Sequence, residues 1–141
     1  MNLTSSELWF IIRSMEKEWQ VEYTNEFGDW WGSLTFDEQD AVESCIPFLC
    51  RLGPALGRPL VDTVKGSCHA NMKELRPPAT NIRILFAFDP RRCAILLIGG
   101  DKTDHWQKWY EKNIPIADTL YDDYIEELRR EGILSREGKL P

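Results

Sequence analysis

The sequence predicts an α+β domain, with a small antiparallel β-sheet, two N-terminal helices packed on one face of it and a C-terminal helix. Three observations support this fold class. Apolar residues recur at helical spacing before residue 53, three strand-like segments separated by prolines follow, and a second helical stripe lies near the end. At 141 residues the chain is long enough for one hydrophobic core and too short to divide comfortably into two domains.

The N-terminal region predicts one strand and one short helix. Residues 18–24 alternate, with Trp19, Val21 and Tyr23 on one face, as is typical of a half-buried strand. Asn25 is expected to cap the helix that follows, because aromatic residues then recur three and four positions apart.

A longer second helix is better specified. Thr35 and Glu38 have the spacing of a capping box, in which each side chain binds a backbone N–H group that lacks an intrahelical partner. Gly53-Pro54 is expected to end this helix. The apolar residues at helical spacing are Val42, Cys45, Ile46, Leu49 and Leu52. Both helices are therefore expected to pack on a sheet.

Strands are predicted after a Gly/Pro-rich connection at residues 57–59. The expected strands are residues 68–76, 81–88 and 92–98, with Pro77-Pro78 and Asp89-Pro90 between them. An antiparallel meander is the simplest arrangement. In the middle strand Arg83 should lie on the face opposite the apolar residues Ile82, Ile84, Phe86 and Phe88. The last strand lacks alternation, as expected for a strand covered on both sides, and Gly99-Gly100 should end it.

The sequence of the C-terminal region contains a polar stretch and predicts a final helix after it. Residues 102–113 are expected to begin a helix or an ordered loop. Pro115 should lie near the start of the final helix, because proline is favoured in the first helical turn. Gly132 is expected to close that helix.

The predicted organisation is one cytoplasmic domain with two flanking segments. Residues 1–14 precede a second methionine, Met15, and are expected to be an N-terminal extension or the product of an upstream start codon. Residues 15–131 form the domain, and residues 132–141 a flexible tail. No apolar run approaches the roughly 20 residues that span a bilayer, so we expect no membrane partner.

The charge of the chain is unevenly distributed. A formal net charge of -6 argues against a generic nucleic-acid binder. Residues 65–112, however, contain nine Lys/Arg and five Asp/Glu, a net charge of +4, which leaves eight basic and eighteen acidic residues, or -10, for the remainder. This asymmetry favours a folded site for a polyanion on an otherwise acidic protein, with an ordinary mixed surface as the alternative.

The four cysteines form no CxxC pair and are expected to be reduced thiols. Cys68 and His69 are neighbours, but the sequence offers no further metal ligand at a suitable spacing from them. We therefore expect no metal site and no cofactor.

The stretch from Asn71 to Asp118 resembles the RelE/ParE superfamily and, within it, the phage-derived HigB-like toxins. The resemblance depends on Met72-Lys73-Glu74-Leu75-Arg76, on Arg83 in the next strand, on Leu96-Leu97-Ile98 before Lys102, and on Ile114-Pro115-Ile116-Ala117-Asp118. It implies a RelE-like fold and a toxin of a type II toxin–antitoxin system that cuts mRNA, without metal and on the ribosome, and so inhibits translation. It also implies a cognate helix-turn-helix antitoxin (HigA-like) as partner, and no direct DNA binding is expected.

Candidate catalytic residues follow from this chemistry. Metal-free RNA cleavage uses the 2′-hydroxyl as nucleophile, so the protein must remove a proton, neutralise the phosphorane and protonate the departing oxygen. Arginine suits the phosphate because a guanidinium donates two hydrogen bonds at once. Arg83 is the first candidate, because the resemblance matches it to the family's phosphate-binding arginine and it faces away from the apolar residues of its strand; Arg76 is the second. Lys102 matches a basic position of the family, and His105 could shuttle a proton. We expect Arg83 and Lys102 to converge on one exposed patch. The alternative for Arg83 is a surface salt bridge, and the alternative for Arg76 is a pair with Glu74 across the sheet.

Candidate RNA-binding residues combine cations with aromatic rings. They are Lys73, Lys108, Trp109 and Tyr110. Packing of the two rings onto the sheet is the alternative. Lys73 alternates with Glu74, so only one of the two should face the site. The best-known RelE proteins carry two lysines on this strand, where this chain has Met72 and Glu74, which leaves the identity of the general base open.

Two other functions remain open at this point. The ParE branch of the superfamily inhibits DNA gyrase, and a degenerate member would retain only antitoxin binding; the acidic total charge and Glu74 favour such a non-nuclease module. A structural phage-derived protein is the third reading.

Overall fold

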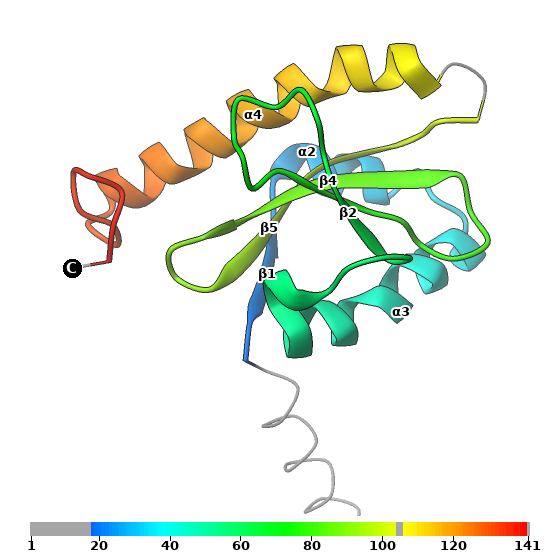
Figure 1. The fold of residues 1–141 in the computed structure, drawn as a ribbon, viewed down its shortest axis with the longest axis horizontal. Helices are drawn as coiled ribbons and strands as arrows, with labels where there is room; N and C mark the ends of the chain where they lie inside the picture. Colours follow the sequence, from blue (N-terminus) through cyan, green and yellow to red (C-terminus); the bar gives the residue numbers. More distant parts are fainter. Residues whose placement is uncertain (1–17, 104–105, 141) are drawn as a thin grey trace, which may run out of the picture.

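The computed structural model describes residues 18–103 and 106–140 (Figure 1). The expectations for residues 1–14, for Met15 and for His105 fall outside these ranges. The elements in chain order are β1 (Gln20–Tyr23), α2 (Asn25–Trp31), α3 (Phe36–Leu52), a 3-10 turn (Gly53–Ala55), β2 (Val61–Thr63), β3 (Lys73–Leu75), β4 (Ile82–Asp89), β5 (Cys93–Asp101) and α4 (Trp106–Arg130). The α+β class is confirmed.

The strands form one sheet in the order β1-β5-β4-β3-β2. The pairs β2–β3, β3–β4 and β4–β5 are antiparallel, as the meander predicts. The sheet as a whole is mixed, because β1 joins the edge parallel to β5. Alternation within a strand reports which face is buried but not the direction of its neighbour, and a parallel pair needs a long connection, which α2, α3 and the other strands provide here.

The two N-terminal helices cover one face of the sheet. Figure 1 shows α3 on the side of the sheet opposite α4. Phe27 from α2 and Val42, Cys45 and Leu49 from α3 are buried in the core formed with this face. The sheet contributes Leu75, Ile82, Ile84, Phe86, Ala94 and Leu96. The predicted packing of both helices on one face is therefore confirmed.

The long helix α4 covers the other face alone. Ile114 and Ala117 pack there on the alternate residues of the sheet, Leu85, Ala87, Ile95 and Leu97, together with Met72. The opposite orientation of even- and odd-numbered residues in β4 follows the predicted alternation. Because apolar residues of β5 point to both faces, its continuous apolar run is explained.

Helix boundaries differ from the expectation at two places. Thr24, not Asn25, caps α2, because its hydroxyl accepts the Phe27 N–H at 3.1 Å. The capping box of Thr35 and Glu38 is present as predicted. Pro115 lies inside α4 rather than near its start, since the helix begins at Trp106 and Trp109 already packs on the sheet.

Three strand predictions need correction. β2 was not expected, and β3 is limited to three residues of the predicted 68–76 segment. β5 continues through Gly99 and Gly100 to Asp101. The reason is close packing: a Cβ on Gly99 would collide with the Trp30 ring, and one on Gly100 with the Trp109 ring. The glycines therefore make room for two indoles and do not break the strand.

The C-terminal residues turn back after α4. Gly132 follows its end with φ +76°, the left-handed conformation predicted for the closing glycine. Leu134 is buried, and flexibility of residues 132–141 stays a prediction. All four cysteines lie in the described residues, and no disulfide joins any two of them. No described helix has the length and apolar character needed to cross a membrane.

Candidate functional site

A buried carboxylate organises the predicted arginines. Glu74 of β3 has only 4% of its side chain exposed, and its Oε1 accepts a hydrogen bond from Arg76 Nε at 2.8 Å. Arg83 Nε of β4 lies 3.3 Å from the same oxygen. Arg83 Nη1 also donates to the Ile82 carbonyl at 2.8 Å. The two guanidinium groups therefore share one counter-charge.

The register of the sheet explains this meeting. Glu74 pairs with Leu85 on β4, so Arg83 is its diagonal neighbour on the same face. Arg83 lies on the α4 side, opposite the apolar residues of its strand, as predicted. Its side chain is nevertheless only 14% exposed, so Arg83 adds little to the exposed patch that was expected. The ion pair with Glu74 and the cover provided by α4 keep it close to the sheet.

Lys102 follows β5 and joins the same cluster. Its backbone N–H donates to the Asn81 carbonyl at 3.1 Å, which fixes the chain beside the start of β4. Burial lowers the pKa of Lys102, and the positive charges of Arg83 and Arg76 lower it further, with Glu74 acting in the opposite direction. Arg83 and Lys102 thus lie within electrostatic reach of each other, but of the two only Lys102 lines the cleft described next.

The N-terminal part of α4 closes one side of a cleft next to this cluster. The cleft has a volume of about 630 Å³. Among its lining residues are Lys65, Glu74, Arg76, Lys102, Trp106 and Tyr110. The pKa of Tyr110 is raised, first by burial and then by its hydrogen bond to Glu74. Trp106 is 56% exposed, and the Lys102 Nζ lies 5.8 Å from its ring centre. Cationic and aromatic side chains therefore lie next to each other in the lining of the cleft.

The predicted RNA-binding residues divide into two groups. Tyr110 lines the cleft. Trp109 packs against Gly100 and the sheet, which is the packing alternative for this ring. Lys73 pairs with Phe86 and so lies on the face of α2 and α3, while Glu74 faces the cluster. Lys108 is exposed on α4 and does not line the cleft.

Sequence reasoning missed the organising role of Glu74. The residue was noted as a departure from the family pattern and as an alternative partner of Arg76, and its alternation with Lys73 left open which of the two faces Arg83. The signal that could have identified it is the antiparallel pairing of the two strands, which makes a carboxylate and an arginine diagonal neighbours. The hydroxyl of Tyr110 could not be assigned, because its partner is 36 residues away.

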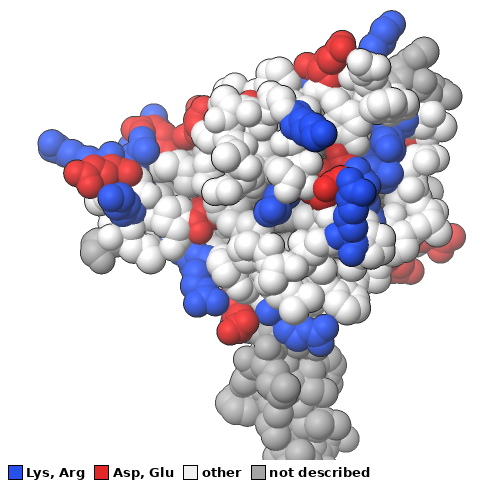
Figure 2. All heavy atoms as spheres, in the orientation of Figure 1, with Lys and Arg blue, Asp and Glu red and all other residues white. Residues whose placement is uncertain are grey.

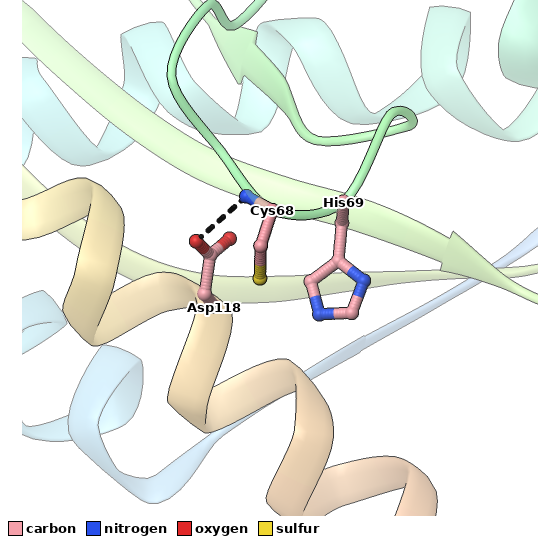
Figure 3. Close-up of side chains that lie close together, drawn as sticks. All are labelled: Cys68, His69 and Asp118. Atoms are coloured by element: carbon pink, nitrogen blue, oxygen red, sulfur yellow. Dashed lines mark hydrogen bonds between the residues drawn. The ribbon is translucent and has the colours of Figure 1, made fainter.

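A second polar cluster joins the segment before β3 to α4. Cys68, His69 and Asp118 each offer one ligand atom, and these atoms lie within 4.8 Å of one another. Figure 3 shows the Cys68 side chain between the Asp118 carboxylate and the His69 ring. The Cys68 backbone N–H donates to Asp118 Oδ2 at 3.0 Å. The fold therefore brings Asp118, 50 residues after Cys68 in the sequence, to the two side chains that could bind a metal ion.

The surface of the molecule alternates in charge. Figure 2 shows basic and acidic atoms side by side on one face, with no single continuous basic area. The three cations Arg76, Arg83 and Lys102 are accompanied by two acids, Glu74 and Asp62, whose Oδ2 lies 3.2 Å from Arg76 Nη2, which leaves an excess of one positive charge. A local excess of this size suits a single phosphate group and does not require a basic protein.

Comparison with known proteins gives a consistent result. Residues 29–122 match the family described as phage derived protein Gp49-like (DUF891). The chain is 53% identical over 96 residues to a Mycobacterium tuberculosis (strain ATCC 25618 / H37Rv) protein named "Putative toxin HigB3", with 68% of this chain and 84% of the relative covered. It is 46% identical over 99 residues to "Putative toxin HigB2" of the same strain, of which it spans 49%.

A solved structure supports the same fold. The isolated RelE toxin of E. coli superimposes with a TM-score of 0.51 at 8% sequence identity, over 68% of this chain and 98% of the other. At this identity the likeness concerns the fold alone.

Proposed function

Since the chain belongs to the phage-derived Gp49-like family, the HigB-like toxins of the RelE superfamily, we propose that it is the toxin of a type II toxin–antitoxin system and cuts mRNA without metal, on the ribosome. One observation carries the nuclease part of the proposal. Arg76, Arg83 and Lys102 come from three consecutive strand ends and meet beside a cleft that is open to solvent.

The cations would act on the scissile phosphate. Arg76 and Arg83 neutralise the phosphorane, because a guanidinium offers paired donors to its oxygens. Glu74 holds both groups in place before RNA binds, so fewer rotamers are lost on binding. The arginine nearest the open cleft is Arg76, with a third of its side chain exposed, and it makes the first contact.

Lys102 would move the proton. Its lowered pKa brings the neutral amine closer to physiological pH, so it can take the proton of the 2′-hydroxyl. His105, which lies outside the described residues, stays a candidate for the proton of the departing oxygen. Trp106 stands at the cleft and offers an exposed ring on which an unpaired base can stack.

The proposed partners are an antitoxin and mRNA on the ribosome. Two relatives are named as toxins, and a type II toxin requires a cognate antitoxin, here proposed to be a helix-turn-helix protein of the HigA type. Translation takes place in the cytoplasm, which is therefore the proposed location. No direct binding to DNA is proposed.

The proposal is tested by translation in vitro with toe-printing of the mRNA. The wild-type chain should stop protein synthesis and create new mRNA ends within codons. Arg83→Ala should lose cutting by about 100-fold or more, as on removal of one donor to a developing oxyanion. Arg136→Ala, an exposed arginine far along the chain, serves as control and should cut normally.

A gyrase assay run beside it separates the competing function. A ParE-like inhibitor would block DNA supercoiling and leave translation intact. Inhibition of supercoiling without mRNA cleavage, or full cleavage by Arg83→Ala, would contradict the proposed site.

A further inference from the structure

The cluster of Cys68, His69 and Asp118 has different side-chain types from the cleft beside Arg76 and Lys102. It offers a thiol, an imidazole and a carboxylate, the three side-chain types that bind zinc in proteins. None of the three lines the cleft. Cys68 and His69 precede β3, and Asp118 lies in the middle of α4, so the cluster joins two elements that are distant in sequence.

We propose that Cys68, His69 and Asp118 form a zinc-type metal site, with Asp122 as the fourth ligand. Asp118 and Asp122 are one helical turn apart, which places both carboxylates on one face of α4. Asp122 Oδ1 lies 2.8 Å from His69 Nε2. A metal ion in place of the proton between these two atoms would bind both the imidazole and the carboxylate.

The first three ligands require only a small adjustment, whereas the carboxylate of Asp122, which is 61% exposed and lies outside their group, must rotate further towards them. Ligand atoms around a tetrahedral zinc ion, with bonds of about 2.0 to 2.3 Å, lie roughly 3.3 to 3.8 Å apart. The three atoms of the cluster already lie within 4.8 Å. Cys68 is exposed and the other two side chains are half-buried, so rotation of the side chains can close the difference of about 1 Å without displacing the core.

The backbone around the ligands is already ordered. Ser67 Oγ donates to Asp118 Oδ1, and the Cys68 N–H donates to Asp118 Oδ2. The His69 ring packs edge-on against Tyr121, with ring centres 4.8 Å apart. A site that is held in place in this way loses little conformational entropy when an ion binds.

The local charge favours a cation. Asp118 and Asp122 bring two carboxylates next to the Cys68 thiol and the His69 ring. The thiol proton is released when the metal binds, and the divalent ion then compensates the thiolate and the two carboxylates. Sulfur, nitrogen and oxygen together select zinc over magnesium or calcium, which prefer oxygen alone.

The ion would have a structural role. The segment that carries Cys68 and His69 also contributes Lys65 and Gly66 to the cleft. Metal binding would therefore attach one wall of the cleft to α4. This proposal does not depend on the nuclease function, because metal binding can be measured without RNA.

Cobalt(II) titration of the full chain, freed of metal with a chelator, tests the site. We expect one equivalent of Co²⁺ to produce a thiolate-to-cobalt charge-transfer band, which Zn²⁺ then displaces. Zn²⁺ should also raise the melting temperature in proportion to the logarithm of its concentration. The absence of a band, or a stoichiometry far below one, would overturn the proposal.

Matched variants identify the ligands. Cys68→Ser keeps the backbone hydrogen bond to Asp118, so it should fold normally, lose the charge-transfer band and bind Zn²⁺ at least about 100-fold more weakly. Asp122→Asn should bind at least tenfold more weakly. Cys50→Ser and Asp123→Asn alter a thiol and a carboxylate outside the cluster and should bind as the wild type does. A band that persists in Cys68→Ser would show that another thiol binds the ion, and the assignment would be wrong.

Discussion

Arg83 Nε lies 3.3 Å from Glu74 Oε1, although the two residues belong to different strands. The contact lacks the geometry of a hydrogen bond, since Arg83 Nε is a buried nitrogen without a hydrogen-bond partner among the described residues. The carboxylate forms its good hydrogen bond with Arg76 instead. Arg83 is thus held by charge and by the Ile82 carbonyl, which leaves part of its donor capacity for a ligand.

Glu74→Gln should destabilise the protein. The amide keeps the shape of the side chain but removes the charge that compensates two arginines in a partly buried place. We expect the free energy of unfolding to fall by about 2 kcal/mol. Urea denaturation measures this change, with Glu131→Gln, an exposed residue past the end of α4, as control. Equal stability of the two variants would show that the arginines do not need this counter-charge.

Lys102 should determine the pH dependence of cleavage. If the neutral amine accepts the proton, the rate rises with pH and levels off at a pKa below the usual 10.5, because the folded protein lowers the pKa of Lys102. Lys102→Arg keeps the positive charge and cannot lose its proton in this range, so it should remove the rising limb and lower the rate by about 100-fold. The measurement is a single-turnover pH–rate profile. A rising limb that survives in this variant would assign the proton transfer to another group.

Gly100→Ala should disturb the packing of α4. A Cβ at this position collides with the Trp109 indole, so the ring must move away from β5. We expect a loss of about 1 to 3 kcal/mol in the free energy of unfolding. Gly57→Ala is the matched control, because a Cβ there meets no atom within 4 Å. Guanidinium denaturation followed by the fluorescence of the six tryptophans measures the stability of both variants.

Glu22 should contribute to stability above acidic pH. Burial raises its pKa, but hydrogen bonds from Tyr124 and Arg91 outweigh this effect, so the pKa in the folded protein lies below the usual 4.5. A carboxyl with a lowered pKa stabilises the fold above pH 4.5, and this contribution is lost as the pH falls through the folded value.

Glu22→Gln tests this dependence. The difference in melting temperature between wild type and Glu22→Gln should be largest near pH 7 and shrink as the pH falls below about 4, where the wild-type carboxyl takes up its proton. Glu26→Gln, on the exposed side of α2, provides the control. A difference that is constant over the whole range would mean that Glu22 acts through packing and not through its charge.

The sequence predicted most helices and strands because their signals are local. The capping box of Thr35, the alternation in β4 and the closing Gly132 all depend on neighbours within a few residues. The parallel pairing of β1 with β5 joins Tyr23 to Leu96, and no local pattern reports such a partner. Gly99-Gly100 was misread for the same reason, since the indoles that require the glycines come from other elements.

The sequence predicted several residues of the candidate site but not the contacts between them. Arg83, Arg76 and Lys102 were selected by their positions on strands, and the structure brings them together. Glu74, Tyr110 and Asp118 acquire their roles only through contacts across the sheet or between the sheet and α4. Side-chain partners at long sequence separation are the part that a single sequence does not contain.

Both outer strands of the sheet are short. β1 has four residues and β2 has three, while the central β4 and β5 have eight and nine. An unpaired strand edge is a template on which a second chain can add, and a short edge offers few backbone groups for such an addition. The protein should therefore resist aggregation through its sheet edges, even though its central strands are almost entirely apolar.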